Sequence, residues 1–500
     1  MTCMDKKHLP LPCPRHAAAE TPQAEALRRQ RQRRRRGVRA SSVSDQLRGQ
    51  TRCACRPRRT LGARRRALLA ARRHVASAAA DPTADGTAAQ LPQPLLCLIL
   101  RLACAGGAVP TACAAACVCR SWRAAVAAAG ADLWHSADLS FAWCRPSDAV
   151  VTRLTVRGTW ASLSALSLAG CATLSDKALE ALSSTHTPAL RTLDLRECRG
   201  FSAAALQRLA AASSLTSLDL SRVVLRPAGD FEKAVRGVCV AGSLTALSLA
   251  GCPRVTSATI RSVMQCPQLR SLNLTAAGTP RGVALHIEAL QRACPLLEEL
   301  HLSGLGLDGG FQAPPQAPGV PAGDGFPALR VCELAAGFRM TSHGAVPSRS
   351  FVDDAMLRRV LWTSSRLSRL ALGGTLVTAD GIAALPALDL AHVALEHSAA
   401  ATDDAAHVVT QRWRHSLMVA SFAGGGEAVT DATPEALSRC LRLHACDLSA
   451  TAISVAGVRA LLLREPAVDV TLTACRGLDR SLRRAALAGT SALAQALACS

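Results

Sequence analysis

The chain has 500 residues, 49% of them apolar, which is more than a single hydrophobic core usually holds. It contains no tyrosine and only 3% aromatic residues, so few side chains are available for stacking nucleic-acid bases. The net charge of +22 is concentrated at one end, because residues 1–80 hold 21 Lys and Arg against 4 Asp and Glu. The rest of the chain is nearly neutral and shows no basic stripe of the kind that binds nucleic acid.

Residues 1–88 form an arginine- and alanine-rich tail, with the run RRQRQRRRR at positions 28–36. Charge repulsion and low apolar content predict that this tail is disordered. Three interpretations stay open: a nuclear import signal, an organelle transit peptide, and an extension without function. The sequence therefore predicts a cytoplasmic or nuclear location without choosing between them.

Residues 89–135 are predicted to form a small helical domain. Leu91-Pro92 opens a leucine-rich segment, and proline favours the entrance of a helix. Leu95, Ile99 and Leu102 then follow at helical spacing and share one face.

A membrane span is the alternative for this region, because Arg101 is the one charged residue between positions 95 and 119. Arg101 itself, Pro110 and the Gly106-Gly107 pair interrupt that span. We therefore expect no membrane span.

The segment Val118-Cys119-Arg120-Ser121-Trp122, together with Leu91-Pro92 and Leu133-Trp134, resembles an F-box. The resemblance implies a domain that docks the Skp-type adaptor of a cullin–RING ubiquitin ligase. It departs from the family pattern at Gln93-Pro94, where an acidic pair is usual, and in a longer linker after Leu102. By resemblance, the adaptor-facing residues are Leu91, Pro92, Leu95, Leu96, Ile99 and Val118, and the helical core contains Leu102, Trp122 and Trp134.

From about residue 150 to residue 500 a unit with leucines at relative positions 1, 4 and 6 recurs. It is clearest at Leu190/Leu193/Leu195, and successive units start 25 to 29 residues apart. Ser202, Thr256 and Thr378 precede helical patterns and are predicted N-caps. A strand, a turn and a capped helix in each unit predict an α/β solenoid shaped as a horseshoe.

Towards the C-terminus the frame weakens, and we place it at Leu385/Leu388/Leu390 and Leu443/Cys446/Leu448. Two insertions interrupt it, at residues 304–325 and 336–351. The first contains a G-x-G-x-x-G match, but prolines follow where a phosphate-binding helix would have to begin. No cofactor is therefore expected.

The 21 cysteines do not predict a disulfide scaffold. Cys171, Cys198, Cys252 and Cys475 share one repeat position, where a small buried side chain supports the turn. Cys53/Cys55 and Cys117/Cys119 lack the spacing of zinc ligands, so we expect no bound metal.

Residues that alternate with the strand leucines are predicted to face the concave side of the horseshoe. Their mixed polar character suits a protein partner more than nucleic acid. The candidate partner-binding residues are Thr192, Asp194, Arg196, Asp219, Asn273, Glu299 and His301.

An F-box followed by cysteine-containing leucine-rich repeats resembles the F-box leucine-rich-repeat proteins, which are substrate receptors of SCF-type ubiquitin ligases. The resemblance implies a noncatalytic subunit with two partners, an adaptor leading to the cullin–RING core and an unidentified protein substrate. The first alternative is a repeat scaffold outside any ligase, and the second is a membrane-anchored repeat protein.

Overall fold

The computed structural model describes residues 91–498, with gaps at 105–108, 141–145, 157–159, 183–186, 213, 227–230, 241–242, 279–282, 284, 306–324, 342–343, 348–351 and 463–466. The chain divides into two units, Met1–Gly86 and Thr87–Ser500, and every described element belongs to the second. The predicted tail and most of the first predicted insertion lie outside the described residues.

Three helices open the described part: α4 (Gln93–Ala103), α5 (Val109–Ala116) and α6 (Arg120–Leu133). Pro94 lies in the first turn of α4, where the missing backbone N–H has no helical acceptor to lose. Leu96 and Leu100 of α4 are fully buried and pack with small side chains of α5 and α6. These helices therefore have a compact hydrophobic core of their own.

Thirteen short parallel strands follow and pair in chain order in one sheet. The strands of this sheet are β1 (Ser136–Asp138), β2 (Ala165–Ser167), β3 (Thr192–Asp194), β4 (Ser217–Asp219), β5 (Ala246–Ser248), β6 (Ser271–Asn273), β7 (Glu299–His301), β8 (Val331–Glu333), β11 (Arg369–Ala371), β12 (His392–Ala394), β13 (Val419–Ser421), β14 (Ala445–Asp447) and β15 (Asp469–Thr471).

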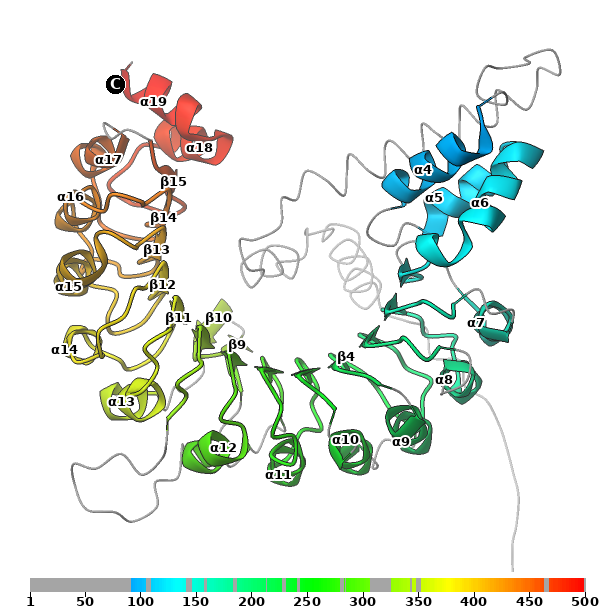
Figure 1. Cartoon of the computed structure of the whole chain (residues 1–500). Helices are drawn as coiled ribbons and strands as arrows, with labels where there is room; N and C mark the ends of the chain where they lie inside the picture. The colour runs from blue at the N-terminus through cyan, green and yellow to red at the C-terminus, as the bar shows by residue number, and fades with distance from the viewer. Residues whose placement is uncertain are drawn as a thin grey trace, which may run out of the picture. The chain divides into compact units, whose positions relative to one another are not determined.

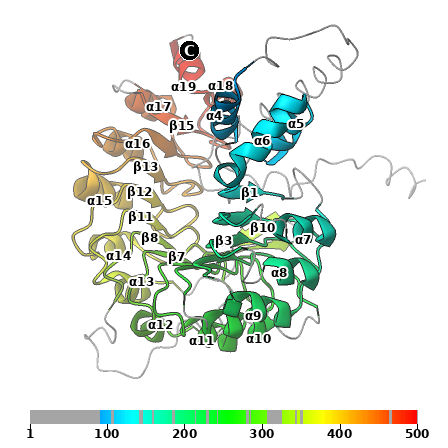
Figure 2. The same ribbon diagram turned by 45° about the vertical axis from the view of Figure 1, so that its right-hand side comes forward.

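One helix follows almost every strand, on the convex side of the repeats, while the strands line the concave side (Figures 1 and 2). Thr256, Thr378 and Ser202 cap their helices as predicted, each accepting a backbone N–H with its hydroxyl. The helices are α7 (Asp148–Val156), α8 (Asp176–Leu182), α9 (Ala203–Ala212), α10 (Phe231–Val240), α11 (Ser257–Val263), α12 (Ile287–Ala293), α13 (Asp354–Leu361), α14 (Ala379–Ala383), α15 (Asp403–Trp413), α16 (Ala432–Leu437), α17 (Val455–Leu462), α18 (Arg480–Ala488) and α19 (Thr490–Ala498).

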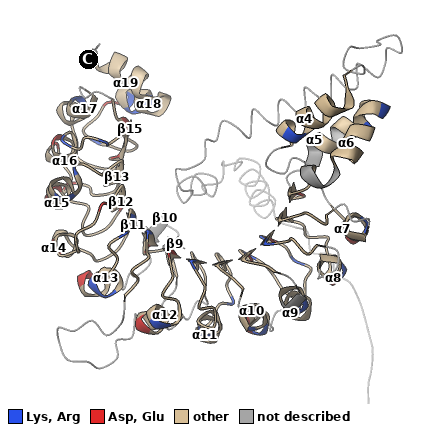
Figure 3. Cartoon of the chain, viewed as in Figure 1, with Lys and Arg blue, Asp and Glu red and all other residues tan. Residues whose placement is uncertain are grey.

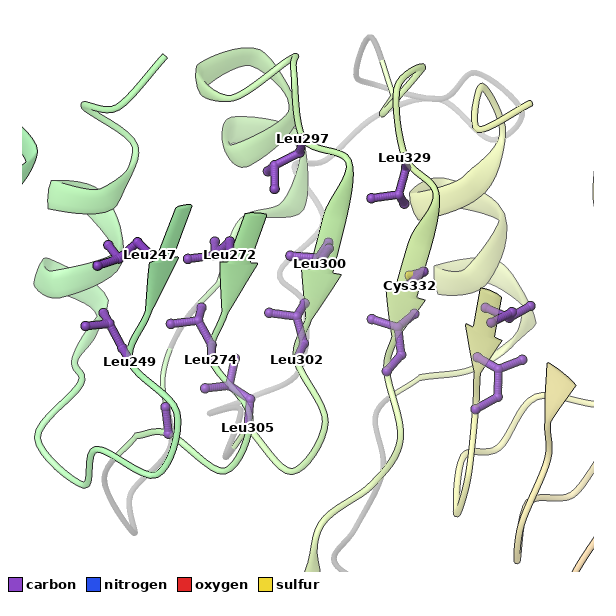
Figure 4. Close-up of a cluster of buried hydrophobic side chains, with 14 of the residues drawn as sticks. Leu247, Leu249, Leu272, Leu274, Leu297, Leu300, Leu302, Leu305, Leu329 and Cys332 are labelled. Carbon is purple, nitrogen blue, oxygen red and sulfur yellow. The ribbon is translucent and has the colours of Figure 1, made fainter. Parts of the chain in front are cut away.

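The leucine frame makes the solenoid core. Equivalent leucines of successive strands stand in register, so that Leu247, Leu272 and Leu300 form one row and Leu249, Leu274 and Leu302 the next (Figure 4). Each of these side chains is at most 5% exposed. The predicted solenoid is therefore confirmed, and its core grows by one layer per repeat.

A residue with positive φ follows the last frame position in nearly every repeat. Six of these residues are not glycine, among them Glu197, Arg222 and His397. The left-handed conformation turns the backbone N–H toward the next repeat, as when Gly170 donates to the Arg196 carbonyl at 2.6 Å. The turn hydrogen bond offsets the strain of about 1–2 kcal/mol that a side chain suffers at positive φ.

The structure corrects the sequence-based boundaries in two places. The sheet begins at β1, with Trp134, Ala137 and Leu139 in the frame positions, and not near residue 150. The repeat placed at Leu385/Leu388/Leu390 is wrong, since β12 uses Leu390, Val393 and Leu395. The first repeat was missed and the second was misplaced because a smaller side chain, Ala137 or Val393, replaces leucine at the middle of the strand.

Within the second predicted insertion lies a two-stranded antiparallel hairpin, β9 (Phe338–Thr341) and β10 (Gly344–Pro347), outside the main sheet. β8 pairs directly with β11, so the sheet continues past this insertion without a break. On the convex side Arg359 of α13 forms an ion pair with the buried Glu288 of α12 and fastens the same junction.

The frame cysteines are structural. Cys198 and Cys252 donate their S–H groups to the Leu168 and Leu220 carbonyls of the preceding repeats at 3.2 and 3.1 Å. Burial raises the pKa of Cys198 to about 12 and that of Cys252 to about 11, so both stay protonated near neutral pH.

None of the helices described is both long enough and apolar enough to cross a membrane. In the predicted alternative span, α4 has only 11 residues, whereas a span needs about 20.

Candidate functional site

Helix α4 has two apolar faces of different character. Leu96 and Leu100 point into the helical core and are at most 1% exposed. Leu95, Leu98, Ile99 and Leu102 lie at spacings of three and four residues on another face and are 48%, 51%, 40% and 72% exposed. We call these four residues the outer face of α4.

The outer face is unusual in this molecule. Elsewhere in the described residues, the large exposed apolar side chains are scattered singly over different elements, for example Leu376 and Leu487. Singly exposed apolar residues are normal, whereas a contiguous group marks an interaction surface. Arg101 is the one charged residue of α4, and Figure 3 shows the rest of the helix without charge.

Two predicted roles in this domain are wrong. Leu102 is not a core residue, since it is the most exposed member of the outer face. Leu96 cannot contact an adaptor, because its side chain is 0% exposed and lies in the helical core. The sequence spacing identified the shared face of Leu95, Ile99 and Leu102 but did not show which face of the helix was buried.

The other predicted residues of the domain fall into two groups. Pro92 and Val118 are exposed, and Leu91 is partly buried against the helical core. Trp122 packs on the helical core and Trp134 packs on both this core and the solenoid core. Both tryptophans are partly buried, and Trp134 joins the two cores because it occupies the first frame position of the first repeat.

The second surface is the concave face of the sheet. We define it as the two residues that flank the buried middle residue of each strand, together with the residue after the next buried frame position. It carries eight carboxylates against two arginines, Arg196 and Arg369. The carboxylates are Asp138, Asp194, Asp219, Glu299, Glu333, Glu396, Asp447 and Asp469.

The edge of the sheet where the strands begin carries arginines. Arg270 forms an ion pair with Glu298 at 2.6 Å, and Arg330 lies 3.7 Å from the same carboxylate. Arg191 adds a further positive charge at this edge. The acidic character therefore belongs to the sheet surface and the strand ends.

Three of the predicted binding residues form one cluster. Arg196 lies 2.7 Å from Asp194 and 3.3 Å from Asp219 of the neighbouring strand. Burial raises the pKa of Asp219, with the negative charge of Asp194 adding to the effect and hydrogen bonds from Ser221 opposing it. Thr192 is exposed beside this cluster without joining it.

The strand-end aspartates also have a structural task. Asp194, Asp219 and Asn273 each accept the backbone N–H of the residue two positions later, at 2.9 to 3.0 Å. Asp447 accepts the N–H of Ser449 in the same way at 2.9 Å. One side-chain oxygen of each residue therefore stabilises the turn.

A second cluster surrounds His301. Its Nδ1 lies 2.9 Å from Glu333 and its Nε2 lies 4.0 Å from Glu299, while Arg369 lies 3.3 Å from Glu333. Burial alone would raise the pKa of Glu333, but His301 and Arg369 outweigh it and lower that pKa. Glu299 also accepts a hydrogen bond from the Ser271 hydroxyl at 2.8 Å.

A third group was missed by the sequence reasoning: Glu396 after β12, Ser421 in β13 and Asp447 in β14. Burial within the concave side raises the pKa of Glu396, a hydrogen bond from Ser421 opposes the rise, and the negative charge of Asp447 adds to it. The alternation of strand positions could have indicated Asp447, but the misplaced frame at β12 concealed Glu396.

Two surface cavities of about 140 and 220 Å³ lie beside α13–α14 and beside α18. Both are below the roughly 300–1,000 Å³ of usual small-molecule sites. Within the described ranges no three His, Cys, Asp or Glu side chains are grouped so as to hold a metal ion.

The arrangement defines a leucine-rich-repeat solenoid with a small helical domain before its first repeat. No protein-family model matches the chain, and neither does any curated protein. Among solved structures, the chain is similar to the Rad7 and Elc1 complex of yeast, with 15% identity over 67% of this chain and 85% of that chain and a TM-score of 0.42. It is also similar to an internalin (inlF) from Listeria monocytogenes, with 13% identity over 59% of this chain and 77% of that chain and a TM-score of 0.34.

Proposed function

We propose that this protein is a noncatalytic substrate receptor of an SCF-type ubiquitin ligase. In this proposal the helical domain docks the Skp-type adaptor, and the concave face of the solenoid holds a protein substrate. Ubiquitin transfer would then take place on other subunits, and the receptor would contribute only by positioning its substrate.

The observation that carries the proposal is the outer face of α4. Leu95, Leu98, Ile99 and Leu102 keep apolar side chains in solvent on a helix whose opposite face is already packed. Burying such a face against a partner gains roughly 25 cal/mol for each Å² removed from water. The resemblance of the same segment to an F-box supplies the adaptor as the partner.

The concave face supports the second half of the proposal. Its eight carboxylates repel phosphate backbones, so a protein partner fits this surface better than a nucleic acid does. Polar and charged side chains on a rigid sheet are also suited to orienting a protein surface.

Co-purification of the full chain with a Skp-type adaptor tests the proposal. Leu98→Asp places a charge on the outer face, and because Leu98 is 51% exposed the fold should tolerate it. Leu376→Asp is the matched control, since Leu376 is 58% exposed on the solenoid. We expect wild type and the control to retain the adaptor and Leu98→Asp to lose it.

The opposite outcome identifies the alternative. If the folded wild-type chain does not retain the adaptor, the helical domain only caps the solenoid and the protein is an interaction scaffold outside the ligase. That outcome would fit the absence of acidic residues from the first turn of α4.

A further inference from the structure

The carboxylate groups of the concave face differ in the cations that lie beside them. In the first cluster Arg196 bridges Asp194 and Asp219 of adjacent strands. In the second cluster Arg369 and His301 both contact Glu333. Each cluster is thus neutralised in part by a cation that the chain itself provides within ion-pair distance.

The third group differs in this respect. Neither Glu396 nor Asp447 forms an ion pair with a lysine, arginine or histidine of the described residues. Burial and the negative charge of Asp447 raise the pKa of Glu396, and they outweigh the hydrogen bond from Ser421 and the positive charges of His397 and Arg369, which lower it. His392 in the same strand adds little positive charge, because burial, Arg369 and His444 lower its pKa.

A buried hydroxyl lies between these carboxylates. Ser421 is 6% exposed, and its hydroxyl interacts with the Glu396 carboxylate, while no donor of the described residues reaches its Oγ. The register aligns Ala394, Ser421 and Asp447 across three strands, and Glu396 follows Ala394 by two residues. Because neighbouring strands lie about 4.8 Å apart, one long cationic side chain can reach both carboxylates and the hydroxyl.

We propose that Glu396, Ser421 and Asp447 form a binding site for a lysine or arginine side chain of the protein held on the concave face. The carboxylates accept charge-assisted hydrogen bonds from the cation, and the Ser421 oxygen accepts a further one. The inference deepens the proposed function and rests on its claim that the concave face binds a protein.

The test measures binding of a fluorescein-labelled octalysine peptide to the full chain by fluorescence anisotropy at low ionic strength, where surface charges are least screened. Glu396→Gln and Asp447→Asn each remove one charge. The Asp447→Asn protein should keep its turn, because Asn273 accepts the equivalent backbone N–H in β6. Each variant is expected to weaken binding about threefold to tenfold, as for loss of one charged contact.

Two further variants keep the result decisive. Glu435→Gln on the convex helix α16 changes the net charge equally and should alter Kd less than about twofold, since that residue is exposed and pairs with Arg439. Ser421→Ala removes only the hydroxyl beside Glu396 and should weaken binding modestly while leaving the melting temperature unchanged within about 2 °C. Equal weakening by Glu435→Gln and Glu396→Gln would show attraction by net charge alone and would overturn the site.

The chain's own basic tail is the competing occupant. Replacing Arg33, Arg34, Arg35 and Arg36 by glutamine in the full chain should leave octalysine affinity within about threefold, as expected for screened charges that do not occupy the site. Binding that becomes tenfold tighter would assign the site to the tail and overturn its assignment to a partner. The adaptor takes no part in this assay, so its result stands apart from the test of α4.

Discussion

At the scale of single residues, aspartates at helix N-termini connect one repeat to the next. Asp148, Asp176, Asp354, Asp403 and Asp431 each accept the backbone N–H of a serine or threonine that precedes the following helix, at 2.7 to 3.0 Å. Asp403 also accepts the hydroxyls of Thr430 and Thr433 at 2.7 and 2.6 Å. Charged hydrogen bonds of this kind, which we call the ladder, therefore join five pairs of neighbouring helices on the convex side.

This ladder predicts a pH dependence of stability. Partial burial of Asp403 would raise the pKa of its carboxyl, but the hydrogen bonds from Thr433 and Thr430 outweigh that effect and lower it. A carboxyl with a lowered folded-state pKa stabilises the fold above its unfolded pKa of about 3.9, and this contribution is lost as pH falls through the folded pKa. Asp403→Ala should therefore destabilise the chain by about 1–2 kcal/mol at pH 7, with the difference from wild type shrinking below about pH 4.

Thermal or urea unfolding of both proteins between pH 7 and pH 3 measures this difference. Asp404→Ala is the control, since it removes the same charge from the same helix turn at an exposed position. A wild-type-to-variant difference that stays constant down to pH 3 would mean that the carboxylate charge contributes nothing.

At the scale of elements, α4 combines a buried row and an exposed row of leucines within 11 residues. The buried row packs the helical domain, and the outer face is exposed to solvent. The structure thereby separates the buried Leu96 from the exposed Leu102, which the sequence spacing had assigned the other way round.

The two rows predict opposite effects of the same substitution. Leu96→Ala should cost about 2–5 kcal/mol in the unfolding free energy of the helical domain, because it creates a cavity in a packed core. Leu102→Ala should change stability by less than about 0.5 kcal/mol, since its side chain is 72% exposed, and should act on adaptor binding alone. Hydrogen exchange of the α4 amides measures both values, and comparable losses of protection in the two variants would contradict the orientation of the helix.

At the scale of the whole molecule, the sequence was informative wherever leucine filled the frame. The strands around Leu193, Leu218 and Leu272 lie where the pattern places them, because a row of identical side chains repeats its signal in every layer. The pattern failed at Ala137 and Val393, where neighbouring leucines complete the layer around a smaller side chain. Periodicity alone could not find these strands.

The candidate sites were likewise predictable only where the leucine frame was clear. Asp194, Arg196 and Asp219 were predicted to face the concave side, and they meet there in one cluster. The pairing of Glu396 with Asp447 was not predictable, because it spans three repeats and depends on a strand that the leucine pattern does not reveal. Likewise, the spacing within α4 showed a common face but not which side of the helix the other helices cover.

The central claim is that the outer face of α4 binds a Skp-type adaptor by burying apolar surface. Calorimetric titration of the full chain with the adaptor at several temperatures tests it most directly, because burial of apolar surface on binding gives a negative heat-capacity change. We predict binding with a negative heat-capacity change for wild type and for Leu376→Asp, and no binding for Leu102→Asp. Absence of binding by the folded wild type, or unchanged binding by Leu102→Asp, would contradict the claim.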